Sequence, residues 1–347
     1  MARLVLHDPV WYDQMPYLPF PENWPTFTPK GTSRVTQELR SDKFADWLES
    51  YAKSMELNIW TETSIQGTPT YDSSSHTWTV HLSRPNGSTR VFHPHHIILA
   101  TGTVGNPHVP QFPGATTFKG PIYHSSNFPG GHHFKGQKAV IIGACNSAHD
   151  IAQEFHDNNS QVTIVQRSST TIISHTALLN VLLANFNEDT PTEYMDMVSQ
   201  SMPGPVVKTV FQYATGVVAQ IDKPLLEGLE KVGFKLDYGY EGTGLSFKAF
   251  GMGGGYYIDV GCSKLIIDGK VKVKEGQQVD KFVEDGVVFA DGTKETADVV
   301  VLATGYGRMR DKAREIFGDA VMDKVSPAVG FTEEGDWALT WQSLTPI

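Results

Sequence analysis

The pattern of apolar and polar positions predicts a strand, a tight turn, a helix and a second strand between Lys138 and Arg167. Ala139 to Ile142 and Val162 to Val165 are apolar runs, and His149 to His156 repeats apolar residues at helical spacing. A glycine-led turn, Gly143 to Ala148, joins the first strand to the helix. Such a βαβ unit brings backbone N–H groups and a helix N-terminus to one strand end, where a dinucleotide pyrophosphate can bind.

Two other stretches of the sequence contain the same series of predicted elements: three strands, the last of which ends in Ala-Thr-Gly. In the first, strands are predicted at Trp78 to Leu82, Thr89 to Phe92 and His95 to Ala100, the last running into Thr101-Gly102. In the second they are predicted at Val279 to Val283, Val287 to Phe289 and Asp298 to Ala303, followed by Thr304-Gly305-Tyr306. The order occurs only twice and at a spacing far beyond that of solenoid repeats, which favours two similar nucleotide-binding lobes.

The remaining segments are predicted to be helices or irregular loops. Residues 1 to 30, rich in proline and aromatic residues, are predicted to form an irregular packed loop, and the polar stretch Gly31 to Asp42 to be turn-like. Phe44 to Leu57 has the pattern of an amphipathic helix. An insertion, about residues 168 to 261, carries helical patterns at Thr176 to Phe186 and Val206 to Ile221 and is expected to form an apolar lid or packing layer.

Composition limits the class of protein. The 347 residues suffice for about two domains, and the formal net charge of −10 argues against a general nucleic-acid surface. Two cysteines without a CxxC motif exclude a disulfide framework and a four-cysteine zinc site. We expect no metal, because His93, His95 and His96 lie at strand spacing without Cys or carboxylate partners. No signal peptide and no membrane span is evident, so we expect a cytoplasmic protein.

The turn supplies the first group of candidate site residues. Against the G-x-G-x-x-G/A pattern, Gly143 and Ala148 match, and Cys145 replaces the middle glycine. Arg167 stands at the end of the second strand, where NAD-binding units carry an acidic residue, so NADPH is favoured; a surface arginine without this role is the alternative. The candidates for contact with NADPH are Gly143, Cys145, Asn146, Ser147, Ala148, Arg167 and Ser168.

The segment before this unit carries the most specific motif. Phe118-x-Gly120-x-x-x-His124-x-x-x-Phe128 resembles the fingerprint of flavin-containing monooxygenases and their Baeyer–Villiger relatives. Ala100-Thr-Gly102 and Leu302-Ala-Thr-Gly-Tyr306 are similar to the hinges that join the FAD and NADPH domains in that family. The segments LHDPVWYDQMPYLPFPENWP and FADWLESYA also resemble those of fungal and plant members, including the indole-pyruvate class.

The resemblance implies an α/β protein with two Rossmann-like dinucleotide-binding domains and an enzyme that uses FAD and NADPH. The family oxygenates a small organic substrate with O2 through a C4a-hydroperoxyflavin. The domains would be a partial FAD-binding domain (1–105), an NADPH-binding domain (106–302) and a return to the FAD domain (303–347). Matching positions imply cofactor-binding roles, with no catalytic residue assigned, for Thr101, Gly102, Phe118, Gly120, His124, Thr304, Gly305 and Tyr306.

The sequence departs from the family at both ends. The N-terminal βαβ unit with its FAD-binding glycine turn is missing, and the chain stops soon after Trp337 to Trp341, so we expect a truncated or mis-spliced product. The first alternative function is therefore a catalytically inactive NADP-binding fragment without a complete FAD site. A disulfide-reductase-like flavoprotein is less favoured because the chain has no CxxC. A module completed by a partner chain is the third alternative.

Overall fold

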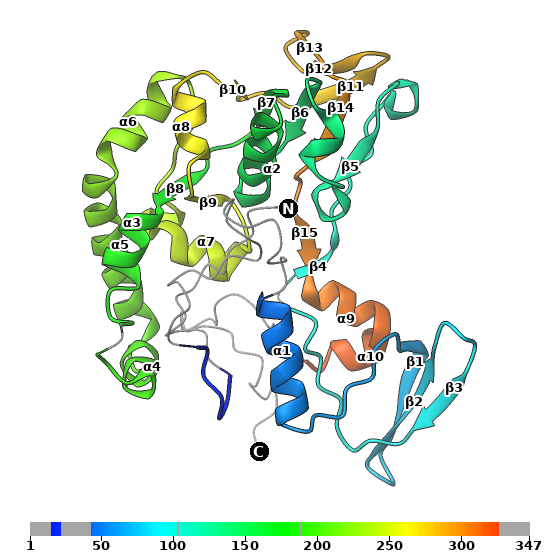
Figure 1. Cartoon of the computed structure of the whole chain (residues 1–347). Helices are drawn as coiled ribbons and strands as arrows, with labels where there is room; N and C mark the ends of the chain where they lie inside the picture. The colour runs from blue at the N-terminus through cyan, green and yellow to red at the C-terminus, as the bar shows by residue number, and fades with distance from the viewer. Residues whose placement is uncertain (1–14, 22–42, 103, 188, 326–347) are drawn as a thin grey trace. The chain divides into compact units, whose positions relative to one another are not determined.

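A computed structural model describes residues 15–21, 43–102, 104–187 and 189–325 (Figure 1). The chain divides into two compact units: unit 1 is Met1–Trp47 with Val109–Gly305, and unit 2 is Leu48–His108 with Tyr306–Ile347. The predicted loop of residues 1–30 is described only at 15–21, where Met15 and Leu18 form an isolated bridge. The polar stretch Gly31 to Asp42 and the segment Trp337 to Trp341 lie outside the described residues.

A five-stranded parallel sheet forms the centre of unit 1. Its strands, in spatial order, are β10 (Val271–Glu275), β7 (Gln161–Gln166), β6 (Lys138–Ile142), β14 (Val299–Leu302) and β5 (Ile122–His124). Every neighbouring pair is parallel. The predicted strands at 139–142, 162–165 and 298–303 are thereby confirmed, and so is the α/β fold class.

Alternate residues of these strands pack into two separate apolar layers, because successive side chains of a strand point to opposite faces and both faces of this parallel sheet are covered. Ile141 and Val301 face a layer that contains α2 (Asn146–Asp157), α6 (Lys223–Lys231) and α8 (Cys262–Ile267). Val140 and Val300 face the opposite layer. That layer holds the antiparallel meander β11 (Val279–Val283), β12 (Gly286–Phe289) and β13 (Lys294–Thr296), whose first two strands the sequence predicted.

The insertion adds a small parallel sheet and several helices to unit 1. The sheet consists of β8 (Thr171–Ser174) and β9 (Tyr256–Asp259). The helices are α3 (His175–Ala177), the π-helical η4 (Leu178–Leu182), α4 (Thr192–Gln200), α5 (Gly204–Ile221) and α7 (Gly244–Met252). Helix α5 confirms the predicted helix at 206–221, whereas the helical pattern at 176–186 ends at Leu182. Short 3-10 turns complete the unit: η1 (Ala115–Thr117), η2 (Ser125–Asn127), η3 (Gly131–Phe134) and η5 (Tyr240–Gly242).

Unit 2 contains an antiparallel meander and two helices. The meander is β1 (Ser64–Asp72), β2 (Thr77–Ser83) and β3 (Thr89–Phe92). The helices α9 (Met309–Phe317) and α10 (Asp319–Met322) follow β15 (Tyr306–Arg308), which pairs with β4 (Val104–Pro107). Helix α1 (Lys43–Ser54) confirms the predicted amphipathic helix, and the unit boundary falls inside it. In the described part of the chain, no helix is both long enough and apolar enough to cross a membrane.

One predicted strand of unit 2 is wrong. His95 to Ala100 has no strand conformation, although Ile97 and Leu99 pack against the apolar cluster around Phe317. Ile98 between them is 69% exposed. An apolar run becomes a strand only when a neighbouring strand takes its backbone hydrogen bonds, and among the described residues no strand runs beside this one.

Candidate functional site

The glycine at the start of the dinucleotide turn is required by the end of a neighbouring strand. Gly143 has φ +130°, and a Cβ atom there would collide with the backbone oxygen of Ala303. The Gly143 N–H donates to Val165 O at 3.0 Å, and the Ala303 N–H donates to Ile142 O at 2.8 Å. Strands β6, β7 and β14 therefore converge on this residue, and only glycine fits between them.

The helix that follows has no side-chain cap at its N-terminus. Cys145 precedes α2 and gives it no side-chain cap, and the first N–H groups of a helix have no acceptor within the helix. Cys145 has φ −110°, so its position does not require glycine. Burial raises the pKa of its thiol, which hydrogen-bonds with the backbone of Gly255 and Tyr256. The thiol side chain is thus engaged by the insertion, while the helix end keeps N–H groups for an anion.

The next three residues have different roles in holding the turn. Asn146 Oδ1 accepts a hydrogen bond from the Ile258 N–H at 2.9 Å, which ties α2 to β9. Ser147 is half-buried, and Ala148 is fully buried in the layer between α2 and the sheet. A small residue at 148 lets the helix pack closely on the sheet, which is what the last position of the motif requires.

Arg167 and Ser168 are exposed directly after β7, beside the strand that carries the turn. The residue before them, Gln166, is fully buried: its Oε1 accepts from the Lys235 N–H and its Nε2 donates to Lys235 O, each at 2.8 Å. Thr170, two residues after Ser168, donates its hydroxyl to Ala144 O at 3.1 Å. Both ends of the arginine loop, residues 167–171, are therefore fixed to the scaffold that holds the turn.

The fingerprint segment is anchored by packing and by one histidine. Phe118 and Phe128 are buried in opposite apolar layers of the sheet. Gly120 leaves no room for a Cβ atom, which would collide with the backbone oxygen of Asp298. His124 Nδ1 accepts from the Ser126 N–H at 3.1 Å, so Nε2 carries the proton and donates it to Gly305 O at 3.0 Å.

The two Ala-Thr-Gly sites both contain glycine in the left-handed region. Gly102 has φ +85° and Gly305 has φ +80°, and a Cβ atom at either would meet no atom within 4 Å. Thr101 is exposed, Thr304 is half-buried, and Tyr306 is 40% exposed at the start of β15. The boundary between unit 1 and unit 2 falls between Gly305 and Tyr306. The open space at both glycines is compatible with the close passage of a cofactor, which remains a prediction.

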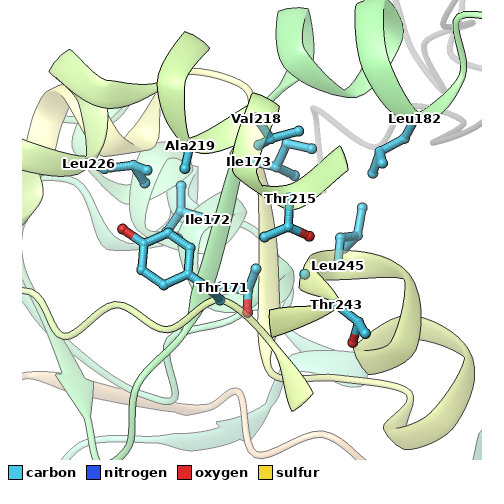
Figure 2. Close-up of a pocket in the computed structure, with 12 residues that line it drawn as sticks. Thr171, Ile172, Ile173, Leu182, Thr215, Val218, Ala219, Leu226, Thr243 and Leu245 are labelled. Atoms are coloured by element: carbon cyan, nitrogen blue, oxygen red, sulfur yellow. The ribbon is translucent and has the colours of Figure 1, made fainter. Parts of the chain in front are cut away.

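A small hollow lies in the insertion among β8, α5 and α7 (Figure 2). Its volume of about 20 Å³ holds roughly one water molecule, so it is not a substrate cavity in this conformation. Thr171, Thr215 and Thr243 line it among apolar residues. Each of these hydroxyls donates its proton elsewhere, to Asp237, to Phe211 O and to Tyr240 O respectively, so only their lone pairs remain for a guest.

His149 on α2 is a buried histidine that sequence reasoning did not single out. Its side chain is fully buried, its Nδ1–H donates to Cys145 O at 3.0 Å, and its ring stacks on Tyr257 at 3.9 Å between centroids. Burial lowers its pKa to about 4, so it is neutral at pH 7. Within the described ranges, no group of three or more His, Cys, Asp or Glu is arranged to hold a metal ion.

A parallel sheet, a glycine turn that meets the neighbouring strand and an uncapped helix end define a dinucleotide-binding α/β protein. The chain belongs to the family described as pyridine nucleotide-disulphide oxidoreductase, whose sequence model matches residues 20–201.

Comparison with individual proteins confirms the predicted relationship to flavin monooxygenases. The chain is 25% identical over 312 residues to indole-3-pyruvate monooxygenase YUCCA1 of Oryza sativa subsp. japonica, covering 88% of this chain and 66% of that protein. It therefore spans just under two thirds of that relative's length.

Solved structures share the fold. Flavin-containing monooxygenase from Stenotrophomonas maltophilia matches with a TM-score of 0.55 and 16% identity, covering 99% of this chain and 74% of that one. Cyclohexanone monooxygenase from Rhodococcus sp. Phi1, solved with NADP+ bound, matches with a TM-score of 0.59 and 14% identity over 90% of this chain and 63% of that one.

Proposed function

We propose that the chain acts as a cytoplasmic FAD- and NADPH-dependent monooxygenase that oxygenates a small organic substrate with O2. The observation that carries the proposal is the pairing of the uncapped α2 N-terminus with Arg167, exposed at the end of the adjacent strand. An anion-binding helix end suits the pyrophosphate, and a guanidinium fork suits the 2′-phosphate that distinguishes NADPH from NADH. The flavin monooxygenase relatives give the class of reaction.

The described residues fit NADPH well. The N–H groups at the start of α2 would bind the pyrophosphate, and Gly143 would let the backbone approach it. Arg167 and Ser168 would hold the 2′-phosphate, and the buried Gln166 fixes the position of their loop. We propose that residues 106–302, nearly all of them in unit 1, form the NADPH-binding domain, and that residues 1–105 and 303–347 belong to the FAD-binding domain.

Two of the described glycines are proposed to contact FAD. Gly102 and Gly305 have the dihedral angles and the open space that a closely passing cofactor needs. In the ranges that the structure describes, a strand–glycine turn–helix of the dinucleotide type occurs once, at 138–157, so a second pyrophosphate turn is not among them. When bound, FAD would supply the hydride acceptance and the oxygen activation, and this chain would position the coenzyme.

A second candidate function is NADP binding without oxygenation, and the presence of a single pyrophosphate turn in the described residues favours it. A disulfide-reductase reaction is less favoured, because the chain has two cysteines, 117 positions apart in sequence, and neither is in a disulfide.

The visible spectrum of the purified chain tests the proposal. The protein is mixed with FAD, desalted, reduced anaerobically with NADPH and then exposed to air. We expect retained flavin absorption that NADPH bleaches and air restores. A colourless protein that binds NADPH would instead establish the second candidate function. A retained flavin that NADPH leaves unreduced would contradict the monooxygenase proposal, and a chain that binds no NADPH would contradict both candidates.

A further inference from the structure

A buried lysine of the insertion pairs with a partly buried aspartate close to the arginine loop. Lys248 is the one charged residue of helix α7, and its side chain is 11% exposed. Its Nζ donates to Asp237 Oδ2 at 2.6 Å and to Gly255 O at 3.0 Å. A buried ammonium group is costly unless it is paired and hydrogen-bonded, and this one is both.

Asp237 uses its other oxygen to hold the strand that follows the arginine loop. Its Oδ1 accepts from the Thr171 hydroxyl at 2.5 Å and from the Gly239 N–H at 2.8 Å. The Ser169 hydroxyl also donates to this carboxylate. Burial by itself raises the pKa of Asp237, but the hydrogen bonds from Lys248, Thr171, Gly239 and Ser169 outweigh burial and hold it below its ordinary value. The group is therefore a carboxylate at neutral pH.

These bonds divide the loop of residues 167–171 into an inner and an outer part. Ser169 and Thr171 donate to Asp237, and Thr170 donates to Ala144 O under the dinucleotide turn. Arg167 and Ser168 remain exposed. Because a hydroxyl has one proton, Ser169 cannot both donate to Asp237 and donate to a phosphate. The inner residues thus hold the loop, and the outer two are presented to a ligand.

We propose that the Asp237–Lys248 pair is a positioning device for coenzyme selectivity, which sets the arginine loop so that Arg167 and Ser168 meet the 2′-phosphate of NADPH. This inference rests on the proposed function. Asp237 anchors the inner side of the loop, and Lys248 cancels its negative charge, which would otherwise repel the phosphate and compete for Arg167. Lys248 also holds Gly255, whose carbonyl accepts from the Thr171 N–H at 3.0 Å.

The test measures equilibrium binding of NADPH and of NADH, which lacks the 2′-phosphate, by titration calorimetry. For Lys248→Met, we expect the NADPH-to-NADH affinity ratio to fall about tenfold, because an uncompensated carboxylate then lies behind the loop. For Asp237→Asn with Lys248→Met, charge balance returns and the ratio should recover to within about threefold of the wild type. Lys264→Met is the matched control, since it breaks an exposed ion pair with Asp268.

Ser169→Ala tests the same loop without removing the ion-pair partner of a charged residue. We expect its NADPH-to-NADH affinity ratio to be about three times lower than that of the wild type. If circular dichroism shows that Lys248→Met does not fold, Ser169→Ala provides the test in its place. Variants that bind NADPH and NADH with equally weakened affinity would show a general structural role and overturn the inference. If the wild-type chain binds neither coenzyme, the proposed function and this inference are both overturned. If the wild type prefers NADPH and neither Lys248→Met nor Ser169→Ala changes that preference, the inference alone is overturned.

Discussion

At the scale of single residues, Gly143 shows how a cofactor motif can also be a packing requirement. Its Cβ position is occupied by the backbone oxygen of Ala303, a residue of the second Ala-Thr-Gly site 160 positions away. The conformation with φ +130° adds a second reason for glycine. The first position of the turn is therefore fixed by the fold itself, before any coenzyme binds.

Substituting Gly143→Ala should lower the free energy of unfolding by about 3 kcal/mol, through steric overlap and an unfavourable dihedral. Urea denaturation followed by circular dichroism measures it. Gly292→Ala is the matched control: Gly292 also has a positive φ, +79°, but its Cβ would meet open space, so the cost should be about 1 kcal/mol. Equal losses for the two variants would refute the role assigned to Ala303.

Arg167 carries the predicted selectivity for NADPH. Replacing it by aspartate places a negative charge where the 2′-phosphate is expected, so NADPH affinity should fall at least about tenfold while NADH affinity changes less. Fluorescence titration with both coenzymes measures this. Arg84→Asp, in the exposed turn between β2 and β3, is the control and should change neither affinity. Unaltered NADPH affinity in Arg167→Asp would remove Arg167 from the site.

At the scale of elements, helix α2 combines an anion-binding end with a buried neutral histidine. His149 stacks on Tyr257 of β9 and lies 5.7 Å from the Phe234 ring, so its ring joins three segments of unit 1. Its folded-state pKa of about 4 lies below the ordinary value of 6.5, because burial disfavours the charged imidazolium. The helix is therefore held by a contact that depends on pH.

Stability should fall as the pH drops through this range. Above pH 6.5 the histidine is neutral in both states; between pH 6.5 and about 4 the unfolded chain binds the proton and the folded chain does not. The free energy of unfolding should therefore decrease by about 3 kcal/mol across this window. Chemical denaturation of the wild type and of His149→Phe at pH 7 and pH 4.5 should show a smaller decrease in the variant.

Phe234→Leu separates packing from titration. It alters a ring beside His149 without removing an ionisable group, so it should lower stability by the same amount at both pH values. The same pH dependence in wild type and His149→Phe would show that other groups cause the acid loss. Asp72 and Asp291 titrate below this window, because hydrogen bonds lower the pKa of each to about 2.

The sequence predicted those strands whose pairing partners lie close to them in the chain. The strands at 139–142 and 162–165 are separated by their own crossover helix, and the meander at 279–289 by a short turn. The pattern misplaced the start of α2, which begins at Asn146 and not at His149, because the turn residues have no apolar periodicity. The strand predicted at 95–100 failed because hydropathy specifies burial but supplies no hydrogen-bond partner.

At the scale of the whole molecule, the chain forms two compact units and passes between them three times. The crossings lie at 47–48, 108–109 and 305–306. The predicted domain boundaries at 105–106 and 302–303 stay a prediction. The segments after the two Ala-Thr-Gly sites, β4 and β15, pair with each other in unit 2, which the sequence did not predict. Gly105 permits this pairing, since a Cβ atom there would collide with the backbone of Arg308.

The sequence alone determined the dinucleotide unit and the relationship to flavin monooxygenases, because each depends on local periodicity or on a short motif. Only the tertiary structure decided why Gly143 and Gly120 must be glycine, since the atoms that exclude a side chain belong to Ala303 and Asp298. It also decided the pairing of Asp237 with Lys248 and their hold on the arginine loop. The physical reason is that the energy of a buried charge depends on which groups surround it in space. Residues far apart in the chain form no sequence pattern that would show which of them become neighbours.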